Sequence, residues 1–216
     1  MRRLDYSLYL VTDRALSRGR TIGDIVKAAV AGGVTCVQLR EKEASTRSFI
    51  AHARLLLAQL QPVGIPLIIN DRLDVALTVG ADGVHLGQQD MEITDARRLA
   101  PAGFIIGISA ESVEDAVRAQ DRGADYIGIS PVYATPTKKD TAPPLGLKGI
   151  RRIRAAVRLP LVGIGGIRED NAAAVIAAGA DGVAVVSALV AADCPRTAAA
   201  ALKQCITLAR QKGSSD

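Results

Sequence analysis

The motif Gly80-Ala81-Asp82-Gly83-Val84 returns as Gly179-Ala180-Asp181-Gly182-Val183 and, in looser form, at two further places in this chain of 216 residues. The looser copies are Ala31-Gly32-Gly33-Val34 and Gly123-Ala124-Asp125-Tyr126-Ile127. Each copy stands between an Ala-rich segment of helical period and a short run rich in Val, Ile or Leu. A glycine at this point can end a helix in the left-handed conformation, and the next residues then turn the chain into a buried strand. The motif therefore indicates a doubled strand and helix unit that is used four times.

Eight short apolar runs alternate with the helical segments along the chain. They are Leu8–Thr12, Thr35–Leu39, Pro66–Asn70, Gly83–Leu86, Phe104–Ser109, Tyr126–Ser130, Leu161–Ile164 and Gly182–Val186. Strands separated by helices form parallel sheets from βαβ units. We therefore predict an α/β fold, a single (β/α)8 TIM barrel, with residues 1–216 as one domain. The alternative is a doubly wound open sheet, which we expect to contain fewer strands at this length and one dominant Gly-rich loop.

The composition suits tightly packed α/β layers, because 49% of the residues are apolar while only 3% are aromatic. The net charge of +5 favours an acidic partner but does not distinguish nucleic acid from a phosphorylated metabolite. Single-stranded nucleic acid is usually bound on aromatic platforms, of which this chain has few. We therefore expect small phosphorylated substrates and no nucleic acid.

The cysteines predict neither a disulfide framework nor a zinc site. Cys36, Cys194 and Cys205 are odd in number and lack Cys-x-x-Cys spacing, which favours the reducing cytoplasm. The N-terminal residues contain no signal-peptide core, and Asp181 interrupts the most apolar late segment, so we predict no membrane span and no membrane partner. We expect residues 212–216 to be frayed, and the sequence leaves the oligomeric state open, a homo-oligomer included.

Cationic and amide side chains follow the second predicted strand. In a continuing strand, Gln38, Arg40 and Lys42 point to one side, and the two residues between them point to the other. A guanidinium and an ammonium on one face suit a pyrophosphate. Taken alone, a solvated strand end whose charges are neutralised by neighbouring glutamates explains the pattern equally well.

Two carboxylates follow neighbouring predicted strands. Asp71 comes after the third strand and Asp90 after the fourth, so the pair could hold one Mg²⁺, which commonly takes one or two carboxylates, waters and phosphate oxygens. Each could instead be the N-cap of the helix that follows it. We favour the metal, because both carboxylates and the cationic cluster lie at the same end of the barrel.

A second phosphate site is predicted after the last two strands. Gly163-Ile164-Gly165-Gly166-Ile167 and Val185-Val186-Ser187 stand where many barrels bind phosphate on backbone N–H groups and a short helix. The longest loop, from Pro131 to about Leu147, lies on the same face and is expected to be functional. His85 and His52 stand beside no evident nucleophile, so we interpret both as satisfied structural histidines.

Taken together, these residues resemble the thiamin phosphate synthase (thiamine-phosphate pyrophosphorylase) family from about Tyr9 to Leu189. The matching strings are Tyr9-Leu10-Val11-Thr12-Asp13, Gln38-Leu39-Arg40-Glu41-Lys42, Asn70-Asp71-Arg72, His85-Leu86-Gly87-Gln88-Gln89-Asp90, Gly107-Ile108-Ser109, Thr135-Pro136-Thr137-Lys138 and Gly163-Ile164-Gly165-Gly166-Ile167. The family's pattern has Gly-Pro, an aliphatic residue and usually Phe where this chain has Ser130-Pro131-Val132-Tyr133.

The resemblance implies a Mg²⁺-dependent transferase of thiamine biosynthesis. It would move the hydroxymethylpyrimidine group from its diphosphate to the nitrogen of a thiazole phosphate and release pyrophosphate. It implies that the diphosphate is bound by the segment Gln38, Leu39, Arg40, Glu41 and Lys42 together with Asn70, Ser109 and Lys138, with Asp71 and Asp90 holding Mg²⁺. By the same resemblance, Thr135, Pro136, Thr137, Gly166, Val186 and Ser187 bind the thiazole phosphate, and Arg40, Lys42, Ser109 and Lys138 act in catalysis.

Three other functions are compatible with such a barrel. A thiazole tautomerase of the same family would not need the diphosphate-binding residues. A Schiff-base aldolase would need a desolvated lysine, for which Lys42 or Lys138 could be considered. A non-catalytic phosphate-binding regulator would bind a phosphate without turnover, since a fold alone does not fix function.

Overall fold

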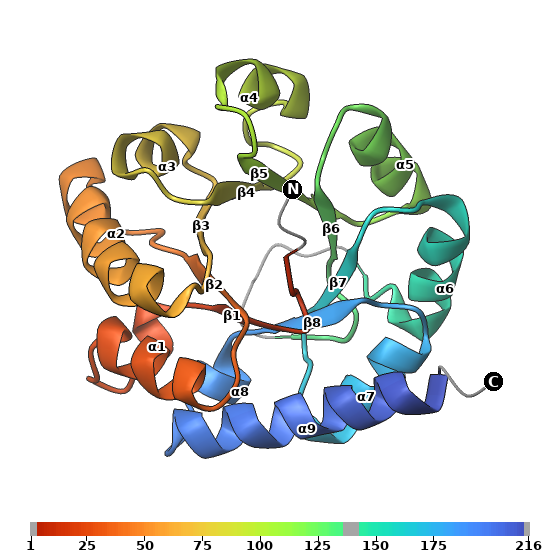
Figure 1. Ribbon diagram of the computed structural model, residues 1–216. Coiled ribbons are helices and arrows are strands. Elements are labelled where there is room, and N and C mark those ends of the chain that lie inside the picture. The colour runs from red at the N-terminus through yellow and green to blue at the C-terminus, as the bar shows by residue number, and fades with distance from the viewer. Residues whose placement is uncertain (1–3, 136–142, 214–216) are drawn as a thin grey trace.

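Eight parallel strands form a closed barrel surrounded by helices (Figure 1). The computed structural model describes residues 4–135 and 143–213, so Pro136, Thr137 and Lys138 lie outside the described residues. The strands are β1 (Leu8–Val11), β2 (Cys36–Leu39), β3 (Leu67–Asn70), β4 (Gly83–Leu86), β5 (Ile105–Ala110), β6 (Tyr126–Ile129), β7 (Leu161–Ile164) and β8 (Gly182–Val185). Each strand pairs with the next in sequence, and β8 pairs with β1. The predicted barrel is confirmed, with strand bounds within one residue of those expected, and the open sheet is excluded.

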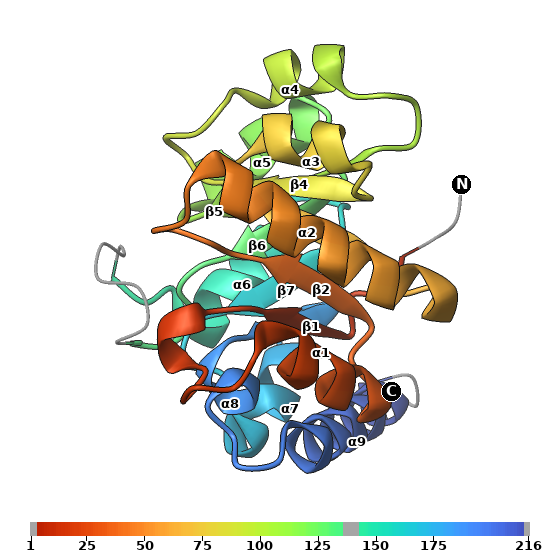
Figure 2. The ribbon, with the colours of Figure 1, turned by 90° about the vertical axis from the view of Figure 1, so that its left-hand side faces the viewer.

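The helices lie outside the strands, as Figure 2 shows from the side for α1, α2 and α3. They are α1 (Ile22–Ala31), α2 (Thr46–Leu60), α3 (Leu73–Val79), α4 (Ile93–Leu99), α5 (Val113–Asp121), α6 (Gly146–Ala156), α7 (Glu169–Ala177), α8 (Ser187–Val190) and α9 (Pro195–Gly213), with short 3-10 helices at Arg14–Leu16 and Gln61–Val63. Thr21, Ser45 and Ser112 begin α1, α2 and α5, each accepting a hydrogen bond from the N–H three residues later. These caps fix where each helix starts.

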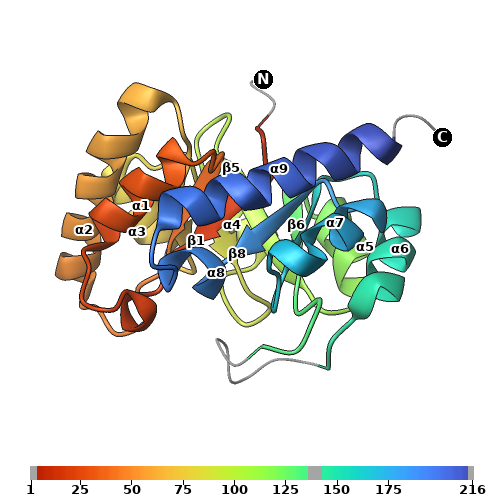
Figure 3. The same ribbon diagram turned by 90° about the horizontal axis from the view of Figure 1, so that it is seen from below.

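Helix α9 covers the seam where β8 meets β1, packed against α1 and α7 (Figure 3). It includes residues 212 and 213, which we expected to be frayed, whereas residues 214–216 lie outside the described residues. Within the described part of the chain, no helix combines the length and the apolar character that crossing a membrane requires.

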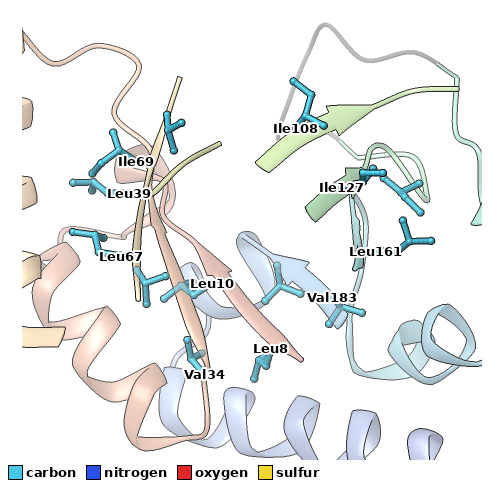
Figure 4. Packing of buried hydrophobic residues seen from close by; sticks show 14 of the residues in the cluster. Leu8, Leu10, Val34, Leu39, Leu67, Ile69, Ile108, Ile127, Leu161 and Val183 are labelled. Atoms are coloured by element: carbon cyan, nitrogen blue, oxygen red, sulfur yellow. The ribbon is translucent and has the colours of Figure 1, made fainter. Parts of the chain in front are cut away.

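The strands are buried on both faces, which explains their nearly continuous apolar sequence. Leu8 and Leu10 of β1 face outward and belong to the large core between strands and helices, where Leu39, Leu67 and Ile69 also lie (Figure 4). The alternate residues face the barrel interior and form a second cluster. Its members are Tyr6, Tyr9, Val11, Cys36, Ile68, Tyr126, Val162 and Ala184. Each fully buried Leu, Ile or Val side chain contributes about 1.5–3 kcal/mol through removal from water.

The repeated motif has the predicted backbone conformation. Gly33, Gly80, Gly123 and Gly179 all have positive φ angles, from 70° to 107°. Gly80 is the left-handed residue that ends α3, and its N–H donates to the carbonyls of Ala76 and Leu77. The glycines of the repeat therefore turn the chain from helix into strand, as expected from the sequence.

The aspartate of the motif holds the strand that precedes it. Its backbone N–H donates to a strand carbonyl, and its carboxylate accepts the N–H of the same strand residue. The pairs are Leu67 N–H to Asp82 (2.8 Å), Ile106 N–H to Asp125 (2.7 Å) and Leu161 N–H to Asp181 (2.8 Å), and in the first repeat Thr35 Oγ1 accepts from Leu8 N–H (3.1 Å). The N–H of each of these strand residues faces the turn that precedes the next strand, where no strand carbonyl is present. The side-chain oxygen of the turn residue accepts the hydrogen bond instead. We call these four pairs the strand clamps.

Candidate active site

One large cavity, of about 930 Å³, opens at the carboxyl ends of the strands. It is lined by most of the described residues that the sequence nominated as site residues, contributed by the ends of seven strands. They are Gln38, Arg40, Lys42, Asn70, Asp71, Asp90, Ser109, Thr135, Gly166, Val186 and Ser187. A cavity at this end of a barrel is where barrel enzymes hold their substrates. Residues separated by up to 149 positions in the sequence thus share one site.

The end of β2 presents alternate side chains to the cavity, as predicted. Gln38 is buried, with 4% of its surface exposed, and Arg40 and Lys42 follow it toward the mouth. The Arg40 N–H donates to Thr12 Oγ1 (3.0 Å), and its Nη1 donates to Asp13 Oδ2 (2.9 Å). Asp13 therefore holds the guanidinium by one edge, and the planar fork keeps further donors for an anion.

Leu39 and Glu41, which the resemblance placed among the substrate-binding residues, do not line the cavity, because they point to the other side of the chain. Leu39 is fully buried in the outer core, and the Glu41 side chain is 4% exposed and accepts hydrogen bonds from Arg14. His52 Nδ1 lies 3.2 Å from the same carboxylate. Glu41 therefore ties the segment after β2 to Arg14 and His52 and does not neutralise Arg40 or Lys42. The alternative of a strand end whose cations are paired by neighbouring glutamates is not supported for Glu41.

Asp71 and Asp90 face each other across the ends of β3 and β4. Burial raises the pKa of the Asp90 carboxyl and the neighbouring Asp71 carboxylate raises it further, whereas the Gly87 N–H (2.7 Å) and Lys42 lower it. Lys42 Nζ donates to Asp71 Oδ2 at 2.5 Å. Lys42 offsets part of the repulsion between the two carboxylates, and a pair of hard oxygen donors this close also suits a divalent ion such as Mg²⁺.

Neither carboxylate has the alternative role of an N-cap. Helix α3 has Arg72 at its N-cap and α4 has Glu92, with no capping side-chain hydrogen bond in either. Asp71 instead adopts a left-handed φ of 63°, held by its N–H donating to the His85 carbonyl (2.8 Å). Such a conformation costs a non-glycine residue roughly 1–3 kcal/mol, and it occurs here at the mouth of the cavity.

A Gly-Gly turn after β7 forms the opposite side of the cavity. Gly165 and Gly166 have φ angles of 101° and 62°. Two N–H groups of the β6 loop donate to this region: Val132 N–H to the carbonyl of Ile164 at the end of β7 (2.8 Å) and Tyr133 N–H to the carbonyl of Gly165 in the turn (3.1 Å). Asn171 Nδ2 donates to the Gly166 carbonyl (3.0 Å). The turn and the β6 loop are therefore built as one surface, with Ser187 at the start of α8 beside it.

Ser130 and Tyr133, where the chain departs from the family's pattern, both line the cavity, whereas Val132 between them is fully buried. The departure therefore changes groups that a substrate can reach. Tyr133 contributes to the same wall as Gly166, since a Cβ added at Gly166 would lie 2.9 Å from the Tyr133 Cβ.

Three side chains that line the cavity or pair with a lining residue were not nominated as site residues from the sequence. His85 is indeed satisfied, but it lines the cavity, and its Nε2 lies 3.0 Å from Ser109 Oγ. Its Nδ1 lies 2.8 Å from the hydroxyl of Tyr126, a second polar residue of the barrel interior. Asp13, which pairs with Arg40, is the third. For His85 and Tyr126, the signal available in the sequence was a polar residue at an inward position of an otherwise apolar strand, whereas Asp13 lies after β1 and gave no such signal.

Comparison with known proteins agrees with this geometry. The family model described as thiamine monophosphate synthase matches residues 8–189. The chain is 59% identical over 199 residues to a thiamine-phosphate synthase from Albidiferax ferrireducens, covering 92% of this chain and 91% of the relative. It is 51% identical to a thiamine-phosphate synthase from Chloroflexus aurantiacus, covering 97% and 96% of the two chains.

Among solved structures, the barrel superposes on a thiamine phosphate pyrophosphorylase from Pyrococcus furiosus with a TM-score of 0.88 and 39% identity, covering 95% of this chain and 97% of the other. More distant barrels, such as 3-hexulose-6-phosphate synthase with a TM-score of 0.66 and 18% identity, share the fold alone. The matched segment runs from the first strand to α8 and contains every described residue of the cavity discussed above. The chain therefore belongs to the thiamine monophosphate synthase family.

Proposed function

We propose that the cavity joins a hydroxymethylpyrimidine diphosphate to a thiazole phosphate with the help of Mg²⁺. Family membership makes the chain a transferase that forms thiamine phosphate, as expected from the sequence. The observation that carries the finer assignment is the combination of two facing carboxylates with Arg40 and Lys42 at one mouth of a cavity large enough for two substrates. A substrate pocket of several hundred Å³ is typical for ligands of this size.

The diphosphate would lie at the ends of β2 to β5. Asp71 and Asp90 would hold Mg²⁺, and no third His, Cys, Asp or Glu joins them among the described residues, so water and phosphate oxygens would complete the coordination. When bound, the ion would supply positive charge to the pyrophosphate oxygens. Lys42 is paired with Asp71 and half exposed, so it can turn from that carboxylate to a phosphate oxygen when the diphosphate enters.

The chemistry requires charge stabilisation and no general base. The bond between the pyrimidine methylene carbon and pyrophosphate oxygen breaks, its electron pair leaves with pyrophosphate, and the thiazole nitrogen forms the new bond with its lone pair. No proton is removed from that nitrogen. Arg40, fixed by Asp13, and Lys42 would stabilise the leaving group, while the cavity-lining residues Gln38, Asn70 and Ser109 would bind the pyrimidine end.

The thiazole phosphate would bind at the opposite wall of the cavity. The Gly165-Gly166 turn, Val186 and Ser187 would bind its phosphate, with Thr135 from the β6 loop. Pro136, Thr137 and Lys138 remain sequence-based expectations for this loop and the leaving group. Two separate anion sites on facing walls would bring the thiazole nitrogen and the departing pyrophosphate to opposite sides of one carbon, an arrangement that suits the transfer.

The alternatives have less support. A Schiff-base lysine must be neutral and desolvated, whereas the Lys42 side chain is 52% exposed and pairs with Asp71. A tautomerase or a phosphate-binding regulator leaves the two facing carboxylates and the cations beside them without a role. We expect the cytoplasm as the compartment, because all three cysteines are free thiols.

The assay that tests the proposal supplies both substrates with Mg²⁺ and follows thiamine phosphate and pyrophosphate together. We expect equal amounts of the two products and loss of turnover with a chelator, restored by added Mg²⁺. Product formation that is unaffected by chelation would refute the metal assignment. Tight binding of the thiazole phosphate without turnover would instead favour a regulator, and borohydride trapping with a carbonyl substrate would reveal an aldolase.

A further inference from the structure

Five polar side chains form a continuous hydrogen-bonded row across the barrel beneath the cavity. Gln38 Nε2 donates to Tyr9 Oη (3.0 Å), and the hydroxyls of Tyr9 and Tyr126 lie 2.9 Å apart. The Tyr126 hydroxyl lies 2.8 Å from His85 Nδ1, and His85 Nε2 lies 3.0 Å from Ser109 Oγ. We call this row the hydroxyl relay. Its members come from β2, β1, β6, β4 and β5, so only the folded barrel assembles it.

Two glycines in the neighbouring strands leave space for the rings of this row. A Cβ on Gly107 would lie 2.1 Å from Tyr126 Cζ, and a Cβ on Gly128 would lie 3.0 Å from His85 Cε1. Two strand positions are therefore glycine beside the tyrosine and the histidine of the relay. Tyr9 and Tyr126 lie at the floor of the cavity but are only 1% and 0% exposed. The Tyr126 hydroxyl is engaged by Tyr9 and His85, so we assign it a role through these two neighbours.

The direction of the hydrogen bonds follows from the Gln38 amide. Burial raises the pKa of the Tyr9 and Tyr126 hydroxyls well above the ordinary value, so each carries one proton to donate. Tyr9 accepts from the amide and donates to Tyr126, because the other group facing its hydroxyl, the Cys36 thiol, is a weak acceptor. Tyr126 then donates to His85 Nδ1.

We propose that His85 is a positioning residue, held by the relay as the neutral tautomer that carries its proton on Nε2. That N–H donates to Ser109 Oγ, which leaves the Ser109 hydroxyl proton to donate to an acceptor atom of the substrate in the cavity. The substrate part of this inference rests on the proposed function, in which Ser109 contacts the diphosphate substrate. The opposite direction would turn the Ser109 proton toward His85 and present only an acceptor to the substrate.

Nitrogen NMR of the histidine side chains tests the tautomer without any substrate. The chain has two histidines, so the ring signals of ¹⁵N-histidine-labelled protein are assigned with one variant, His52→Gln. Above about pH 8, where histidine is neutral, we expect long-range proton–nitrogen correlations of His85 to show the Nε2–H form. A dominant Nδ1–H form, or an equal mixture, overturns the proposal.

Tyr126→Phe removes the donor to Nδ1 and should convert His85 to a mixture of tautomers. Tyr6→Phe is the matched control, because the Tyr6 ring packs on Tyr126 at 4.7 Å but its hydroxyl is not part of the relay. An unchanged tautomer in Tyr126→Phe, or an equal change in Tyr6→Phe, contradicts the proposal. Tyr9→Phe breaks the same row one step earlier and serves if Tyr126→Phe does not fold.

Kinetics then link the tautomer to Ser109. Loss of one oriented hydrogen bond should raise KM for the diphosphate substrate about threefold to tenfold in Tyr126→Phe. In a Ser109→Ala background the same substitution should have no further effect, since the relay acts through that hydroxyl. Additive effects of the two substitutions would overturn the link to Ser109. The NMR result stands apart from activity, so failure of the relay and failure of the proposed function are distinguishable.

Discussion

Gly166→Ala tests whether the Gly-Gly turn and the β6 loop form the wall that binds the thiazole phosphate. A Cβ at this position would lie 2.7 Å from the Ala134 carbonyl oxygen and 2.9 Å from Tyr133 Cβ, and the residue has φ of 62°. The left-handed conformation costs an L-residue roughly 1–2 kcal/mol. Overpacking against the loop adds typically about 1–3 kcal/mol, because one contact is backbone and cannot move alone.

Gly80→Ala is the matched control for the backbone cost. Gly80 has φ of 70° and nothing within 4 Å of an added Cβ. The Gly80→Ala substitution should lower the melting temperature by about 2–8 °C, whereas Gly166→Ala should lower it by about 4–20 °C. KM for the thiazole phosphate should rise in Gly166→Ala and stay unchanged in Gly80→Ala.

Thermal unfolding and steady-state kinetics with each substrate varied in turn measure both effects. The KM of the diphosphate should change less than that of the thiazole phosphate in Gly166→Ala, because the two anions bind on different walls. Equal losses of stability in the two variants would refute the clash. Equal changes in both KM values would refute two separate anion sites.

Three further outcomes are expected. Asp71→Ala and Asp90→Ala should each lower kcat/KM by about 100-fold, the loss of roughly 3 kcal/mol of charge stabilisation, with native circular dichroism; near-normal turnover of either at limiting Mg²⁺ would contradict the metal assignment. An electron-withdrawing substituent on the pyrimidine should slow single-turnover chemistry by orders of magnitude with little change in binding, and an unaffected chemical step would exclude early departure of pyrophosphate. Asp125→Ala should lower the free energy of unfolding in urea by about 1–3 kcal/mol through loss of a strand clamp and of the ion pair with Arg97 (2.6 Å), whereas exposed Asp121→Ala should change it little.

The sequence predicted the barrel because its local signals agree with one another. Apolar runs of strand length, Ala-rich helical segments and the four copies of the glycine motif all indicate the same repeating unit. The strand ends could be located from these runs, and their polar residues Gln38, Arg40, Lys42, Asp71 and Asp90 do line the cavity. Alternation along β2 indicated that Leu39 points away from the cavity, as it does, whereas the resemblance had placed Leu39 among the substrate-binding residues.

Pairings between distant strands could not be predicted from the sequence alone. The hydroxyl relay depends on the facing of Tyr9 and Tyr126 across the barrel interior, and the two residues are 117 positions apart. The contacts of His85 could not be predicted for the same reason, because its two partners, Tyr126 and Ser109, lie on other strands, β6 and β5. The role of Asp13 was hidden because an Asp after a strand also caps a short helix, as its bond to Ala15 N–H shows.

Each strand clamp closes a short segment of the chain between the two residues that it joins, and we call each closed segment a circuit. Each clamp joins groups only 15 to 27 residues apart, so an ordered pair of strands needs little loss of chain entropy to form. The β8 to β1 seam is different, because Tyr9 and Ala184 that pair across it come from opposite ends of the chain. The cost of long-range closure is therefore concentrated at one seam, which α9 covers from outside. A circular permutant whose new termini lie within a circuit would lose the short-range closure of one clamp. A permutant cut between circuits, with the original ends joined, would keep all four. The natural positions for new termini therefore lie in the connections that follow the even-numbered strands.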